Sequence, residues 1–199
     1  GAVAPGVADA EHFAATFETL QMMIKDDRII AGHDISAGGM IVTLLEMCFA
    51  NREGGMTLDL TGIREADTVR LLYSQNPGVI IQVRDKGETE EFLSERGVRF
   101  ACIGHPVRER KLSIVNGDNH FEFDINRCRS LWYRSSYLLD CRQCEPEHAR
   151  ERFDNHGVNA IQFDLKSFKG SFRSLGITPD RKATTGVRAA IIREKGVNG

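Results

Sequence analysis

The chain has 199 residues, a length that suits one domain or one domain with a tail. Its 26 Lys and Arg residues nearly balance its 28 Asp and Glu residues, and the resulting net charge of -2 argues against a nucleic-acid-binding protein. No apolar run approaches the roughly 20 residues that a membrane-spanning helix needs, and the N-terminal residues lack the pattern of a signal peptide. We therefore expect a globular cytoplasmic protein without membrane contacts. Gly1 in place of Met suggests a segment of a longer polypeptide.

Five cysteines are an odd number, and without an export signal they are expected to be reduced thiols. Cys141 and Cys144 form a Cys-x-x-Cys pair. A zinc site needs a second such pair or two histidines at ligand spacing, and His148 and His156 lie too far apart to qualify. The pair alone is a weak indication of metal binding.

The first half of the chain alternates predicted helices and strands. Phe13, Phe17, Leu20 and Ile24 recur at helical spacing in an amphipathic first helix, for which Asp9 is a suitable N-cap. An apolar helix follows the glycines at 38 and 39, with Ile41, Leu44, Leu45, Cys48 and Phe49 on its buried side. Asn76-Pro77-Gly78 ends a third helix, and the β-branched residues 79–83 indicate a buried strand. The predicted helices span 9–27, 38–51, 65–74 and 86–96, and the strands 28–34, 56–60 and 79–83.

Three consecutive strands are predicted next, over residues 98–106, 111–117 and 120–125. Asn116-Gly117 begins a hairpin turn between the last two, so at least one strand pair is antiparallel. Helices over 126–140 and 144–156 complete this part. Interleaved helices and strands followed by consecutive strands predict an α+β fold with a mixed, partly antiparallel sheet packed with helices.

The composition divides the chain into three parts. Residues 1–156 carry the periodic patterns of a globular domain. Residues 157–186 are rich in Ser, Thr, Gly and Lys with weak periodicity, which predicts a linker or an extended wrapping segment. Residues 187–199 begin a new strand, as the first piece of a further domain would.

Residues 31–40, Ala-Gly-His-Asp-Ile-Ser-Ala-Gly-Gly-Met, join a predicted strand to an apolar helix and are the most informative segment. In one interpretation Gly32, Gly38 and Gly39 allow a tight turn that His33 and Asp34 brace.

Two other interpretations assign chemistry to this segment. In the first, backbone N–H groups at the helix N-terminus bind phosphate, Ser36 adds a hydroxyl, and Asp34 holds a Mg²⁺ that bridges phosphate oxygens. In the second, Ser36 is a nucleophile activated by His33, which requires a third, orienting residue. The spacing matches neither the phosphate-binding Gly-x-x-x-x-Gly-Lys-Ser/Thr loop nor the dinucleotide fingerprint Gly-x-Gly-x-x-Gly.

Short stretches of the chain resemble phosphoribosylformylglycinamidine synthase, the large single-chain form of this enzyme family. His33–Gly39 is similar to its His-Asp-x-Ser-Asp-Gly-Gly segment, although Ala37 stands where an acidic residue is usual. The other stretches are Leu44–Ala50, Pro77–Val83, Trp132 with Ser135–Tyr137, and Ile192–Gly199, which resembles the start of the glutaminase domain.

The resemblance implies that residues 1–156 are the second AIR-synthase-like C-terminal domain and residues 187–199 the first strand of a class I glutaminase domain. It implies an ATP-dependent carbon–nitrogen ligase that converts formylglycinamide ribonucleotide to formylglycinamidine ribonucleotide in purine biosynthesis, with glutamine as amido donor. The remaining synthetase and glutaminase domains of the same polypeptide would be its partners.

For residues, the resemblance implies that Asp34 binds Mg²⁺ and Ser36 binds the nucleotide, ATP or a bound ADP. It assigns no catalytic residue to this chain, because the other metal ligands and the glutaminase residues would lie outside it. His33 would contact substrate or brace the loop. The alternative is a domain whose nucleotide site is purely structural, or a non-catalytic interaction domain.

Overall fold

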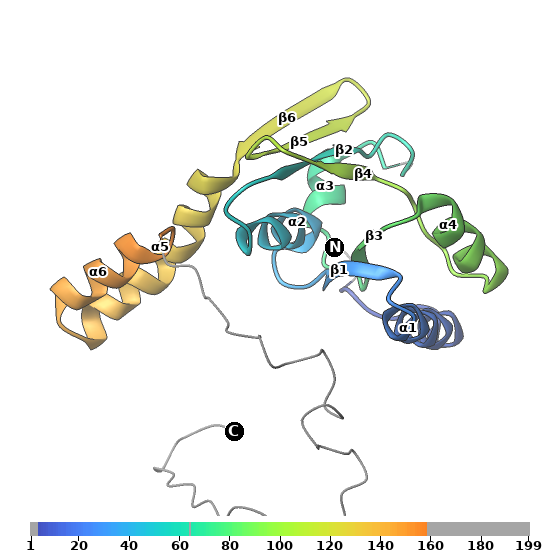
Figure 1. The fold of residues 1–199 in the computed structure, drawn as a ribbon, viewed down its shortest axis with the longest axis horizontal. Helices are drawn as coiled ribbons and strands as arrows, with labels where there is room; N and C mark the ends of the chain where they lie inside the picture. Colours follow the sequence, from blue (N-terminus) through green and yellow to red (C-terminus); the bar gives the residue numbers. More distant parts are fainter. Residues whose placement is uncertain (1–3, 64, 159–199) are drawn as a thin grey trace, which may run out of the picture. The chain divides into compact units, whose positions relative to one another are not determined.

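The computed structural model describes residues 4–63 and 65–158, and these residues form an α+β fold as predicted (Figure 1). The chain divides into two units, Gly1–Asn159 and Ala160–Gly199. The predicted linker beyond residue 158 and the predicted strand within 187–199 lie outside the described residues, so those domain boundaries stay predictions. The helices are α1 (Ala10–Lys25), α2 (Gly39–Phe49), α3 (Thr68–Tyr73), α4 (Lys86–Glu95), α5 (Ile125–Gln143) and α6 (Pro146–Asn155).

Four strands form a mixed sheet in the order β4-β2-β5-β6. The strands are β2 (Gly55–Asp59), β4 (Gly104–Val107), β5 (Lys111–Asn116) and β6 (Asn119–Asp124). β2 pairs with β4 antiparallel and with β5 parallel, and β5 and β6 form the predicted antiparallel hairpin. Gly117 in the hairpin turn has a φ of 59°, a left-handed conformation that glycine adopts without strain. The mixed, partly antiparallel sheet is therefore confirmed.

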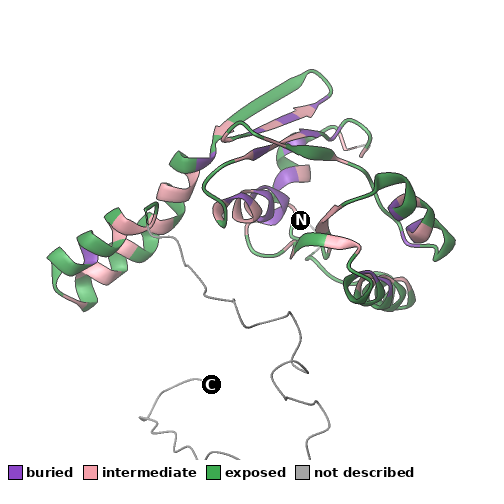
Figure 2. Ribbon diagram, in the orientation of Figure 1, coloured by how far each residue is buried: buried purple, intermediate pink, exposed green. Residues whose placement is uncertain are grey.

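One face of this sheet carries the larger apolar core. Along β5, residues 112, 114 and 116 are buried while residues 111, 113 and 115 are more exposed, as expected for a strand with one covered face. Helices α2 and α3 contribute the opposing side chains, and Figure 2 shows buried residues along α2. The core residues are Met40, Ile41, Leu44, Cys48, Leu58, Leu60, Leu72, Leu112, Ile114 and Ile125. Leu45 and Phe49, predicted to be buried, are half-buried at the edge of this cluster.

Two further strands, β1 (Ile29–Asp34) and β3 (Val79–Val83), form a separate antiparallel pair. His33 lies opposite Ile80 and Asp34 opposite Val79, so the end of β1 is fixed against the start of β3. Residues 79–83 were expected to form a buried strand, but none of them is fully buried and Val79 is 47% exposed. A two-stranded sheet has no central strand, so neither strand is enclosed on both edges.

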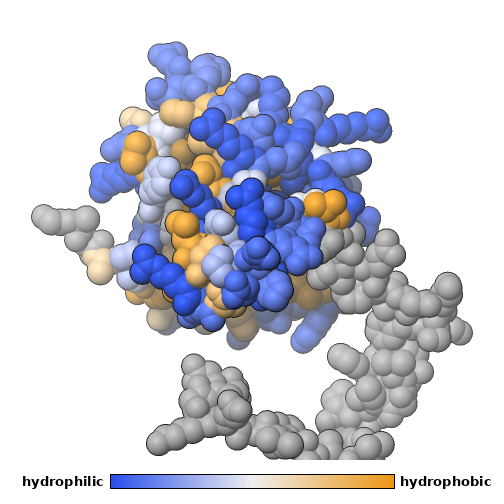
Figure 3. Space-filling model, turned by 90° about the vertical axis from the view of Figure 1, so that its left-hand side faces the viewer, coloured by the Kyte–Doolittle hydropathy of each residue, from blue (hydrophilic) through white to orange (hydrophobic). Residues whose placement is uncertain are grey.

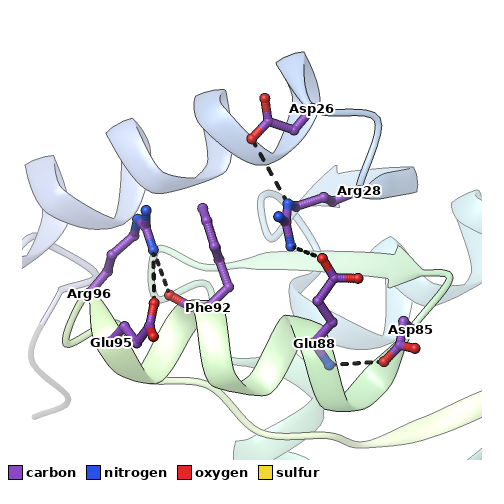
Figure 4. Close-up of polar contacts among 7 residues, drawn as sticks. All are labelled: Asp26, Arg28, Asp85, Glu88, Phe92, Glu95 and Arg96. Atoms are coloured by element: carbon purple, nitrogen blue, oxygen red, sulfur yellow. Dashed lines mark hydrogen bonds and ion pairs between the residues drawn. The ribbon is translucent and has the colours of Figure 1, made fainter.

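A second, smaller core joins α1 and α4 to this strand pair, through Met23, Leu93 and Val98. Polar contacts surround it (Figure 4): Arg28 Nη1 donates to Glu88 Oε1 at 2.7 Å, and the Arg96 guanidinium lies 3.5 Å from the centre of the Phe92 ring. Such stacking combines packing of the guanidinium plane with attraction to the ring face.

Of the apolar stripe predicted on the first helix, only Leu20 packs against this core. Phe13, Phe17 and Ile24 are about half exposed, whereas Thr19 and Met23 are the buried residues of α1. Helical periodicity identifies the residues that share a face, but the neighbouring elements decide which face is covered.

The predicted strand over residues 98–106 is mostly wrong, because regular pairing occurs only from Gly104 to Val107. The amide of Asp59, the last residue of β2, donates to the carbonyl oxygen of Ile103 at 2.8 Å. Residues before Ile103 extend past the end of β2, and Val98 instead packs into the smaller core. A β-type sequence cannot form a ladder without a partner strand of matching length.

Helices α5 and α6 pack against each other. Tyr137 stacks on Phe153 with ring centres 4.7 Å apart, and the Arg152 guanidinium makes two hydrogen bonds to Asp140.

The face viewed in Figure 3 carries separate hydrophobic patches among hydrophilic residues. No helix in the described part of the chain has the length and hydrophobicity needed to cross a membrane.

Candidate functional site

The segment between β1 and α2 is held at both ends by backbone hydrogen bonds. The amide of Ile35 donates to the carbonyl oxygen of Gly78 at 2.8 Å, and the amide of Gly39 donates to the carbonyl oxygen of Ser36 at 3.0 Å. The first bond continues the β1–β3 ladder, and the second closes the turn before the helix. The loop therefore has a defined backbone between two regular elements.

Two glycines determine how the loop enters α2. Gly38 and Gly39 have φ values of 90° and 75°, which side-chain-bearing residues rarely adopt. A Cβ atom on Gly39 would lie 2.7 Å from the carbonyl oxygen of Leu72, so the start of α2 packs directly against the end of α3. Gly32, which the turn interpretation grouped with them, lies inside β1 opposite Ile81 and makes no turn.

The N-terminus of α2 has no side-chain cap. Gly38 occupies the N-cap position and offers no side-chain acceptor, and the first turn carries no acidic residue. Most helices supply an oxygen here, and four others in this structure use Asp9, Asp67, Asp85 and Asp124. The partial positive charge at the start of α2 is therefore not offset by a carboxylate of its own.

Asp34 ends β1 with its backbone fixed and its carboxylate exposed. Its carbonyl oxygen accepts hydrogen bonds from Thr43 Oγ1 at 3.0 Å and from the His33 ring at 2.8 Å. The side chain of Asp34 is 72% exposed, and its contact with the His33 Nδ1 atom is long, at 3.5 Å. An exposed carboxylate on a rigid backbone suits a hard cation such as Mg²⁺.

Asp34 fits such a cation only as one ligand among several. Within residues 4–63 and 65–158, no three His, Cys, Asp or Glu side chains converge to hold a metal ion. Mg²⁺ in nucleotide sites takes most of its ligands from phosphate and water, so a single protein carboxylate is compatible with this chemistry.

Ser36 and Ala37 are exposed at the tip of the loop. Within the described residues the Ser36 hydroxyl makes no hydrogen bond, whereas its carbonyl oxygen accepts from Gly39. The nucleophile interpretation required His33 to activate this hydroxyl. The His33 ring instead contacts the carbonyl oxygen of Asp34 and the carboxylate of Glu46, so the structure does not support a Ser36–His33 pair.

The carboxylate of Glu46 is the element of the site to which sequence reasoning gave no role. Its Oε2 atom lies 3.3 Å from His33 Nε2, and its Oε1 atom accepts a hydrogen bond from Trp132 Nε1 at 2.9 Å. Glu46 lies on α2 and Trp132 on α5, 86 residues apart in sequence. Both residues belong to the short stretches that resemble the family, and this resemblance is the sequence signal that could have pointed to them.

The Cys-x-x-Cys pair does not form a site with the downstream histidines. Cys144 contacts Arg152 and Asp140 at the α5–α6 junction, with Arg152 Nη2 2.7 Å from its sulfur. His156 packs against the rings of Tyr133 and Phe153. These residues connect the two helices.

Comparison with known proteins places this chain in a family. Residues 4–115, more than half of the chain, match the model of the AIR synthase related protein, C-terminal domain, and the chain belongs to this family. It is also similar to the human phosphoribosylformylglycinamidine synthase, with 28% identity over 195 residues. That alignment covers 95% of this chain and 14% of the human protein, so the chain spans a small part of its relative. The similarity predicted from the motifs is thereby confirmed.

Two solved structures are similar to this chain to different degrees. The structure of PurLQS from Thermotoga maritima has a TM-score of 0.53 and 15% identity, and the match covers 62% of this chain and 22% of that chain. T. maritima PurL complexed with ATP has a TM-score of 0.49 at 15% identity, covering 56% of this chain and 20% of that chain. Because the identity is only 15%, the match to PurLQS shows that the fold is shared and nothing about function.

Proposed function

We propose that this chain supplies a magnesium–nucleotide loop to a phosphoribosylformylglycinamidine synthase. The activity would be the ATP- and glutamine-dependent conversion of formylglycinamide ribonucleotide to formylglycinamidine ribonucleotide, a carbon–nitrogen ligation of purine biosynthesis in the cytoplasm. The observation that carries the proposal is the exposed Asp34 carboxylate on a fixed backbone, next to a helix N-terminus without an acidic cap. The similarity to the human enzyme of that name supports the particular reaction.

Each loop residue has a role in this proposal. Asp34 would hold Mg²⁺, which when bound neutralises phosphate charge. The Ser36 hydroxyl, exposed and without a partner among the described residues, would donate to the nucleotide. Backbone amides at the start of α2 would favour the same anionic group through the helix dipole. Gly38 and Gly39 would let the backbone take this path, since a Cβ atom on either would strike Val42 or the end of α3.

The proposed activity needs more than this chain. The remaining metal ligands, the other nucleotide contacts and the glutaminase residues would come from the remaining synthetase and glutaminase domains of the polypeptide. We therefore expect the isolated chain, given ATP, ammonia and formylglycinamide ribonucleotide, to show only background turnover. Turnover well above background would contradict the assignment as one part of a larger enzyme.

The central test is Asp34→Asn in the full-length protein. This change keeps the shape of the side chain and removes the charge that attracts Mg²⁺. We expect weaker binding of a non-hydrolysable ATP analogue with Mg²⁺ present and a smaller effect without it. Ser36→Ala should cost about 1 kcal/mol of binding free energy, the size of one hydrogen bond. Asp118→Asn, at an exposed turn position, is the matched control.

Nucleotide exchange in the full-length protein distinguishes a site that turns ATP over from a purely structural nucleotide site. If the loop serves catalysis, a nucleotide bound there exchanges with added labelled ATP analogue on the time scale of turnover. If the loop serves a structural site, the nucleotide is retained through many turnovers. Unchanged nucleotide content and Mg²⁺ dependence in Asp34→Asn would show that the loop is only a turn.

A further inference from the structure

The two oxygens of the Glu46 carboxylate connect the loop to helix α5. One faces the His33 ring at the end of β1, and the other accepts the indole N–H of Trp132. We infer that Glu46 is a positioning residue for the nucleotide loop, acting through His33, and that Trp132 holds Glu46 in place. This inference rests on the proposed function, because it concerns how well the same loop binds its ligand.

The first step runs from Glu46 to Asp34. The His33 ring contacts Glu46 through Nε2 at 3.3 Å and the carbonyl oxygen of Asp34 through Nδ1 at 2.8 Å. The Asp34 carbonyl oxygen can only accept, so Nδ1 carries a proton, and this bond orients the ring with Nε2 toward the Glu46 carboxylate. Because the same Asp34 carbonyl also accepts from the buried Thr43 hydroxyl, the peptide group that follows Asp34 is fixed from two sides. That peptide group determines the direction in which the loop leaves β1.

The second step runs from Trp132 to Glu46. The Trp132 ring lies 6.0 Å from the Phe49 ring, and Phe49 is one turn after Glu46 on α2. The indole is therefore placed by an aromatic contact as well as by its hydrogen bond. A glutamate side chain has several rotatable bonds, and two partners in different elements restrict it to one conformation.

Partial burial makes this arrangement stronger than a surface ion pair. The side chains of Glu46 and His33 are 26% and 31% exposed, whereas the Asp34 side chain is 72% exposed. Water screens a half-buried carboxylate less than an exposed one. The Asp34 carboxylate is therefore exposed, and the supporting Glu46 carboxylate is half-buried.

A merely structural contact between α2 and α5 would predict a different result. In that case, changing Glu46 would lower the stability of the fold and leave ligand affinity unchanged in the folded protein. A positioning role predicts a change in affinity at a temperature where every variant is folded. The two roles are separated by measuring affinity and stability on the same variants.

The test uses Glu46→Gln in the full-length protein, with the dissociation constant of a Mg²⁺-bound, non-hydrolysable ATP analogue as the readout. The glutamine oxygen still accepts from Trp132, but the charge facing His33 is lost. We expect the dissociation constant to rise about three- to tenfold, below the effect usual for removing a direct partner of a metal ligand. Glu18→Gln, at an exposed position of α1, should leave it unchanged.

A double-mutant cycle adds a second readout. His33→Gln also removes the bond to the Asp34 carbonyl oxygen and should weaken binding at least as much as Glu46→Gln. The double variant should weaken binding by no more than His33→Gln alone, because Glu46 acts through His33. Additive effects would overturn the inference. If Glu46→Gln does not fold, Trp132→Phe, which keeps a large aromatic ring and removes the indole donor, should weaken binding by about twofold or more. Unchanged affinity in that variant would likewise overturn it.

Asp34→Asn separates this inference from the proposed function. If Asp34→Asn weakens binding and Glu46→Gln lowers only stability, the proposed function stands and the positioning role of Glu46 is wrong. If neither change affects binding, the proposed function fails and the inference fails with it.

Discussion

Arg110 Nη1 donates to the carbonyl oxygen of Cys48 at 2.9 Å, across 62 residues of sequence. Cys48 lies in the last turn of α2, and within the described residues its carbonyl oxygen otherwise accepts only from backbone amides at the helix end, such as that of Asn51 at 3.3 Å. The same Arg110 nitrogen reaches the carbonyl oxygen of Gly54, and Arg110 Nε donates to Asn126 Oδ1. One guanidinium thus joins the end of α2, the segment before β2 and the start of α5.

Replacing this guanidinium is expected to destabilise the fold. Arg110→Gln should lower the free energy of unfolding by about 2 kcal/mol, because half-buried carbonyl oxygens lose a charged donor. Urea denaturation at neutral pH measures the change. Arg108→Gln, an exposed arginine two residues earlier, is the control and should stay within about 0.5 kcal/mol of the original protein. Equal effects of the two changes would contradict the role of Arg110.

Gly39→Ala should be strongly destabilising. The residue has a φ of 75°, and the new Cβ would lie 2.6 Å from the carbonyl carbon of Tyr73. We expect a loss of about 2 kcal/mol or more in the free energy of unfolding. Gly87→Ala in α4 is the control, for which we expect a change in stability of the opposite sign. Its Cβ atom would meet only Asp85 Oδ1, at 3.6 Å. Removing glycine flexibility there should raise stability by about 0.5–1 kcal/mol, and a loss at Gly87 similar to that at Gly39 would refute the steric explanation.

The cysteines should differ widely in reactivity. Cys102 is exposed, whereas Cys48 is buried and burial raises the pKa of its thiol. Because the thiolate is the reactive form, a disulfide reagent at pH 8 should label Cys102 quickly and Cys48 only after unfolding. Peptide mass spectrometry of the labelled protein identifies the sites. Cys102→Ser should remove the fast reaction, and rapid labelling of Cys48 in the native protein would show that this part of the core is open.

The β5–β6 hairpin carries a pH-dependent ion pair. Lys111 Nζ lies 2.7 Å from Glu122 Oε1, and this hydrogen bond lowers the pKa of the Glu122 carboxyl. A carboxyl with a lowered pKa in the folded state stabilises the fold above its unfolded pKa, and the contribution is lost as pH falls through the folded pKa. The difference in urea midpoint between the original protein and Glu122→Gln should therefore be small at pH 7 and vanish below about pH 4. A difference that grows on acidification would contradict this assignment.

Much of the local structure was predictable because its causes lie within a few residues of sequence. Asp9 caps α1 as expected, and the predicted hairpin turns at Gly117 and Asp118, between the paired residues Asn116 and Asn119. The apolar spacing of α2 predicted its buried face, with Ile41 and Leu44 in the core. The loop at Asp34 and Ser36 was also visible in the sequence, because its glycines and its resemblance to a known motif are local features.

Contacts between distant segments were decided only by the tertiary structure. Nothing local determines that β2 pairs with β5 in parallel, or that the strand before β5 begins at Gly104. The stripe with Phe13 and Phe17 was visible in the sequence, but its exposure depends on which face of α1 the second core covers. The support of the loop by Glu46 and Trp132 is the clearest case, since it joins residues on two helices brought together only by packing. Periodicity determines what an element is, and the path of the chain determines what the element touches.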